Sequence, residues 1–70
     1  MTYTYRIGLI PRDSANKLSD VCEKNGCELC YAGFEDGMVD VYIKANDKNK
    51  IRTVADQSWF RFYPEDICEY

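Results

Sequence analysis

Cysteine is the residue type in this sequence with the clearest capacity for chemistry. Three of the four cysteines, Cys22, Cys27 and Cys30, fall within the stretch CEKNGCELC, and Cys68 lies near the C-terminus. Thiolates bind zinc, and the Cys-x2-Cys pair of Cys27 and Cys30 is half of a common zinc-knuckle pattern. Two thiols can also form a disulfide, although a reducing compartment keeps thiols free. Because the chain contains no histidine, any such metal site depends on cysteine alone.

The spacing of these cysteines resembles that of plant-type iron–sulfur ferredoxins, Cys-x4-Cys-x2-Cys with a distant fourth cysteine. That resemblance implies four thiolates around one cluster. A second interpretation treats the cysteines as ordinary parts of secondary structure. Cys22 falls on the apolar stripe of an expected helix, where a free cysteine behaves as a small hydrophobe, and Cys30 falls in an expected strand. We favour the second interpretation and expect no metal and no cofactor; a zinc or iron–sulfur protein is the alternative.

Few other residues offer catalytic groups. Without histidine the chain has no Ser-His or Cys-His pair, and its four glycines are too scattered for a phosphate-binding loop. The acidic pairs Glu35/Asp36 and Glu65/Asp66 fall in expected turns, where carboxylates are usually solvated. We therefore expect no enzyme and assign no catalytic residue.

The N-terminal part of the chain predicts a strand followed by a helix. Residues 2–10, TYTYRIGLI, alternate polar and apolar side chains as a half-buried strand does. The face expected to point to the core consists of Tyr3, Tyr5, Ile7 and Leu9. Residues 13–25 then repeat apolar side chains every three or four positions, as an amphipathic helix does. Asp13 or Ser14 can cap the start of this helix, and Asn25-Gly26 suits its end.

The rest of the chain predicts a hairpin, a short helix and a last strand. Residues 27–34 and 38–45 flank an acidic turn that ends in Gly37, which is typical of a hairpin. Residues 48–56 fit a helix capped by Asn46 or Asp47 better than they fit a strand, although β-branched residues leave the strand open. Residues 59–63, WFRFY, alternate as a strand that Pro64 ends. Residues 64–70 form a short acidic tail.

This order of elements predicts one α+β domain over residues 1–70. Strand, helix, strand, strand, helix, strand is the β-α-β-β-α-β order of the ferredoxin-like split βαβ sandwich. Two helices then cover one face of a four-stranded antiparallel sheet. If residues 50–54 are a strand, the alternative is a β-richer sheet with a single helix.

The sheet face turned away from the helices is the expected binding surface. By alternation it presents Arg6, Tyr42, Trp59, Arg61 and Tyr63, joined by Met38 and in one register by Tyr31. Aromatic residues, Met and Arg are enriched at protein interfaces. The tail adds an acidic rim of Glu65, Asp66 and Glu69, which complements a basic protein surface.

Composition narrows the function classes. With 46% hydrophobic residues and a net charge of −3, the chain is expected to fold and to avoid nucleic-acid backbones. No apolar run approaches the roughly 18 residues of a membrane span, so we expect a cytoplasmic protein. The expected function is a small protein-binding inhibitor or regulator of a larger, nucleic-acid-handling protein, or a homodimer. In character it resembles the small acidic inhibitors that phages and mobile elements encode. The alternative is a nucleic-acid-binding sheet face of RNA-recognition type.

Overall fold

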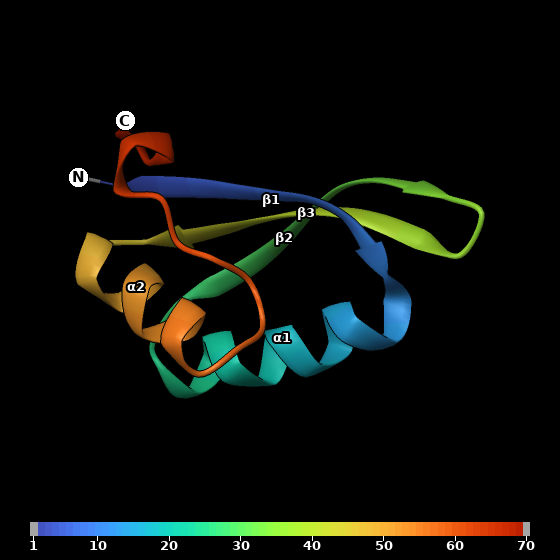
Figure 1. Cartoon of the computed structure of the whole chain (residues 1–70), viewed down its shortest axis with the longest axis horizontal. Coiled ribbons are helices and arrows are strands. Elements are labelled where there is room, and N and C mark those ends of the chain that lie inside the picture. The colour runs from blue at the N-terminus through green and yellow to red at the C-terminus, as the bar shows by residue number, and fades with distance from the viewer. Residues whose placement is uncertain (1, 70) are drawn as a thin grey trace.

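The computed structural model describes residues 2–69 and contains one sheet with two helices on one side of it (Figure 1). The long strands are β1 (Tyr3–Pro11), β2 (Glu28–Glu35) and β3 (Met38–Ala45). Helix α1 (Arg12–Lys24) follows β1, and helix α2 (Lys48–Asp56) follows β3. The chain ends in a 3-10 turn, η1 (Pro64–Asp66), and a two-residue strand, β4 (Cys68–Glu69).

The three long strands form an antiparallel sheet in the order β2-β3-β1. Strand β3 is central and pairs along its whole length with both neighbours. Strand β4 extends the sheet only slightly, because it pairs with Tyr3 and Thr4 at the start of β1. The N-terminal and C-terminal ends of the described chain therefore lie side by side (Figure 1).

The expectation of a four-stranded ferredoxin-like sandwich in β-α-β-β-α-β order is wrong. Residues 59–63, which were expected to supply its fourth strand, pair with no strand in the described part of the chain. Side-chain contacts rather than a backbone ladder hold this segment, as described below. The alternative, a β-richer sheet with a single helix, fits only in part. Residues 48–56 form a second helix, as the preferred interpretation of that segment predicts.

The hydrophobic core lies between the sheet and the two helices. Alternate residues of β3, from Val39 to Ala45, are buried, and they meet buried side chains from both helices. The largest fully buried side chains are those of Leu18, Cys22, Val39, Val41, Ile43, Ile51 and Val54. All described polar and charged residues stay outside this buried set, so the core is held together by apolar burial.

Both helices bury the predicted stripe, but only one begins as predicted. Helix α2 starts after Asp47, whose side chain accepts a hydrogen bond from the Asn49 amide at 2.9 Å. Helix α1 starts directly after Pro11 without a side-chain cap, so the prediction of a cap at Asp13 or Ser14 is wrong. Proline suits this position because its fixed φ lets the strand turn straight into the helix.

Strand β1 contains a bulge that changes which residues face the core. Its register with β3 shifts between Arg6 and Gly8, and Gly8 takes a φ of 100°. A bulge inserts one residue and reverses the alternation beyond it. Consequently Ile10 is buried and Leu9 is 51% exposed, so the prediction that Leu9 faces the core is wrong.

Candidate functional site

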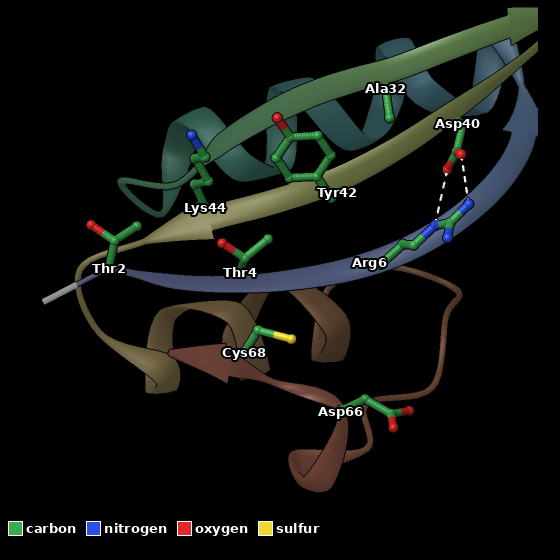
Figure 2. A pocket seen from close by; sticks show the side chains of 9 residues that line it. All are labelled: Thr2, Thr4, Arg6, Ala32, Asp40, Tyr42, Lys44, Asp66 and Cys68. Carbon is green, nitrogen blue, oxygen red and sulfur yellow. Dashed lines mark hydrogen bonds and ion pairs between the residues drawn. The ribbon is translucent and has the colours of Figure 1, made fainter. Parts of the chain in front are cut away.

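The side of the sheet turned away from the helices, here called the open face, carries a broad hollow (Figure 2). The hollow measures ≈ 850 Å³ and draws its lining from the strands and from η1. Thr4, Arg6, Tyr42 and Lys44 point into it because strand alternation turns them away from the buried residues of β1 and β3. The η1–β4 segment, with Asp66 and Cys68, lies along the free side of β1 (Figure 2).

The cations on this face are already engaged with neighbours. The Arg6 guanidinium donates two hydrogen bonds to the Asp40 carboxylate, at 2.7 and 3.4 Å, and the pair is drawn in Figure 2. The Lys44 ammonium lies 5.9 Å from the centre of the Tyr42 ring, within cation–π range. An exposed ion pair of this kind stabilises the fold by about 1 kcal/mol at most. Its main effect is to hold Arg6 in place and to offset its charge.

Carboxylates lie along both borders of the open face. Residues paired directly across strands point to the same side of a sheet. Glu28 and Glu35 pair with Lys44 and Met38, and therefore belong to the open side of β2. Asp66 lines the hollow from the opposite border. The charges of Arg6 and Asp40 thus compensate each other within the open face, and carboxylates lie on both of its borders.

The structure divides the predicted binding residues into two groups. Arg6, Tyr42 and Asp66 meet at the hollow. Met38 also belongs to the open side, since it pairs with Pro11 and Glu35. The second group, Trp59, Arg61 and Tyr63, belongs to the segment between α2 and η1, together with the exposed Glu65 of η1. The Glu69 side chain lies outside the described residues.

The segment of residues 57–63 is fastened to the core through Tyr5. Phe60 and Phe62 lie with ring centres 6.0 and 5.4 Å from the Tyr5 ring. The Tyr5 hydroxyl donates to the carbonyl of Arg61 and accepts from the amide of Tyr63, both at 3.1 Å. The alternation of WFRFY is therefore as predicted, but its outward residues do not join the open face. Those residues are Trp59, Arg61 and Tyr63.

Strand β2 carries an exposed aromatic pair that was not predicted. The rings of Tyr31 and Phe34 stack with centres 6.1 Å apart, and the Arg12 guanidinium lies 5.9 Å from the Phe34 centre. A register shift between Tyr31 and Gly33 puts both rings on the helix side of the sheet. Glycine inside a strand pattern often marks such a bulge, so Gly33 was the available signal.

All four cysteines are free thiols, and they are divided between the two sides of the sheet. Cys22 is buried under the sheet, whereas Cys30 pairs with Tyr42 on the open side and Cys68 lines the hollow. Burial, with smaller effects from the nearby Cys27 and Cys30, raises the pKa of the Cys22 thiol to about 12. Burial also raises the pKa of Cys27, against an opposing effect of Lys50. Within residues 2–69 no three potential ligands gather as a metal site would require.

Comparison of the chain with protein-family models, with curated proteins and with solved structures finds no match. Neither helix in the described part of the chain has the length and apolar character to cross a membrane.

Proposed function

We propose that this chain is a non-enzymatic protein-binding module that docks on a larger, positively charged protein through its open face. The observation that carries the proposal is the charge pattern of that face. Arg6 and Asp40 offset each other, while the carboxylates of Glu28, Glu35 and Asp66 outnumber the further cation Lys44, so the face is negative on balance. Complementary charge steers association and selects partners, so this pattern favours a surface rich in Lys and Arg.

The centre of the face supplies a contact that can exclude water. The Tyr42 ring lies in the hollow near Ala32 of the neighbouring strand, while Cys68 lines the hollow from the far side of β1. Interfaces commonly combine such a small apolar centre with a charged rim. A protein that binds phosphate backbones carries the matching basic surface. Covering that surface would make this chain a regulator or inhibitor, and its four free thiols suit the reducing cytoplasm.

The two alternative functions have less support. A base-stacking face of RNA-recognition type needs several exposed rings, but among the described residues Tyr42 alone supplies an aromatic ring to the hollow, and Lys44 lies over it. Its carboxylate borders also repel phosphate. A cysteine-bound metal needs thiols that converge on one ion, whereas the sheet lies between Cys22 and both Cys30 and Cys68.

The test is capture of partners from the host lysate by the tagged chain, using charge-matched variants. Glu65→Lys with Asp66→Lys reverses the acidic border at η1. Asp20→Lys with Glu23→Lys makes the same change in net charge on the exposed part of α1. We expect the wild type and the α1 variant to retain a basic protein from the lysate. The η1 variant and Tyr42→Ala should retain at least about tenfold less of it.

Salt provides the second readout, because screening weakens attraction between exposed charges. Retention should fall as sodium chloride rises from about 50 to 500 mM, a range in which the Debye length shortens severalfold. Equal loss in both double variants would show dependence on net charge only and would contradict the proposed face. Retention of the same partner by Tyr42→Ala, with circular dichroism confirming its fold, would also contradict it.

A further inference from the structure

The free edge of strand β2 is the second surface with the features of a binding site. Strand β2 pairs with β3 on one side, and no strand within residues 2–69 pairs with its other side. The opposite edge of the sheet differs, because β4 and the Tyr5-bound segment cover the first part of β1. An uncovered edge presents backbone N–H and C=O groups that can accept another strand.

The two sides of this edge differ in chemistry. Its helix side is apolar and consists of Leu29, Tyr31 and Phe34, which pair with the core residues Ile43, Val41 and Val39. Its open side ends in carboxylates at both Glu28 and Glu35. An added strand would therefore meet apolar side chains on one side and negative charge on the other. Side chains of a strand alternate between those two sides.

The aromatic pair on the helix side is available for contact. Phe34 is 69% exposed and Tyr31 is 45% exposed, although both lie on the side of the sheet that the helices cover elsewhere. The hairpin of β2 and β3 extends beyond the N-terminus of α1 (Figure 1), where the side chain of Arg12 lies beside Phe34 and leaves most of that ring exposed. Gly33 between them leaves open space where a side chain would stand, which lets another backbone approach.

We propose that the free edge of β2 binds an extended segment of a partner protein as an added strand, and that this segment alternates apolar residues with Lys or Arg. Its apolar side chains pack on Tyr31 and Phe34. Its cations lie beside Glu28 and Glu35, where opposite charges across strands are favourable. Backbone hydrogen bonds supply affinity, and the alternating side chains supply specificity, as in other cases of strand addition.

A second copy of the chain does not fit this edge. Strand β2 contains neither Lys nor Arg, so an identical strand cannot neutralise Glu28 or Glu35. Antiparallel self-pairing about the middle of β2 would set Glu28 of one copy against Glu35 of the other. Like charges placed directly opposite each other destabilise a sheet. The bulge beyond Tyr31 further discourages indiscriminate pairing.

The test uses the full chain, labelled with ¹⁵N, and short capped peptides as probes. The probe of the proposed class is KVKVKVK, with EVEVEVE and the block peptide KKKKVVV as controls. We expect KVKVKVK to shift the amide signals of β2 and to slow hydrogen exchange along that strand. Its affinity should exceed that of each control by about tenfold, from several cross-strand pairs.

Variants then locate the interaction. Tyr31→Ala with Phe34→Ala should weaken binding of KVKVKVK at least about fivefold, while Trp59→Ala, which removes an exposed ring elsewhere, should leave it unchanged. Equal affinity for the alternating and block peptides would overturn strand addition, as would shifts confined to the open face. Dimers that form through β2 in sedimentation would overturn the choice of occupant. The open-face proposal is tested separately, since Glu65→Lys with Asp66→Lys leaves β2 intact.

Discussion

Tyr5 connects the sheet to the C-terminal segment through both its ring and its hydroxyl. Only 4% of its surface is exposed, and its hydroxyl satisfies one carbonyl and one amide of residues 61–63. Those two backbone groups have no strand partner, because the segment is not part of the sheet. A half-buried backbone group without a partner costs about 1–3 kcal/mol. One phenolic oxygen thus replaces part of a missing backbone ladder.

Replacing Tyr5 by Phe should therefore destabilise the protein more than the loss of a surface hydroxyl would. We expect the free energy of unfolding to fall by about 1–3 kcal/mol, measured by urea denaturation. Tyr42→Phe is the matched control, because it removes a hydroxyl from the open face, and it should change stability by less than about 0.5 kcal/mol. A similar loss in both variants would show that the Tyr5 hydroxyl does not fasten the segment.

The buried Cys22 thiol makes stability depend on alkaline pH. Its pKa rises from 9.0 in the unfolded chain to about 12 in the folded protein because burial disfavours the thiolate. The unfolded chain therefore releases its proton first. The contribution of the protonated Cys22 thiol to the free energy of unfolding is complete below pH 9. It is lost progressively as pH rises from 9 towards 12.

Comparison with Cys22→Ala isolates this effect from the other groups that titrate at high pH. We expect the stability difference between wild type and Cys22→Ala, measured in urea at pH 7, 9 and 10.5, to shrink at the highest pH. The variant has no thiol at position 22 and so lacks this one transition. A difference that stays constant across the series would show that Cys22 does not titrate on unfolding.

At the scale of elements, alternation predicts which side a residue faces but not which strand it pairs with. WFRFY alternates as a strand does, and Phe60 and Phe62 do point inward while Trp59 is exposed. Its backbone nevertheless follows α2 across the edge of the sheet without pairing. Hydrogen bonding between distant segments depends on the path of the connection, and no local pattern encodes that path.

The elements bounded by turn residues were predictable, and those that contain bulges were not. The hairpin was placed correctly because Asp36 and Gly37 supply the positive φ values, 45° and 80°, that its tight turn requires. The meeting of Arg6 with Tyr42 on the open face follows from plain alternation and was predicted. Leu9 lies beyond the bulge in β1, where the alternation reverses, and its side was predicted wrongly for that reason.

At the scale of the whole molecule, the C-terminal segment completes a core that the sheet and two helices leave open. A chain of 70 residues is expected to be stable by only about 4–10 kcal/mol, so one more apolar layer matters. Phe60, Phe62 and Ile67 pack against the buried cluster along the side of β1. The inward and outward residues of this segment should therefore affect the molecule in opposite ways.

Two substitutions in the same segment separate these roles. Phe62→Ala removes a ring that packs on Tyr5 and should lower the free energy of unfolding by about 2–3 kcal/mol, a large part of the total. Trp59→Ala removes a ring that is 55% exposed and should lower it by less than about 1 kcal/mol. Urea denaturation followed by tyrosine fluorescence and circular dichroism measures both variants. If Trp59→Ala proved the more damaging change, Trp59 would belong to the core and the segment would lie in the opposite orientation.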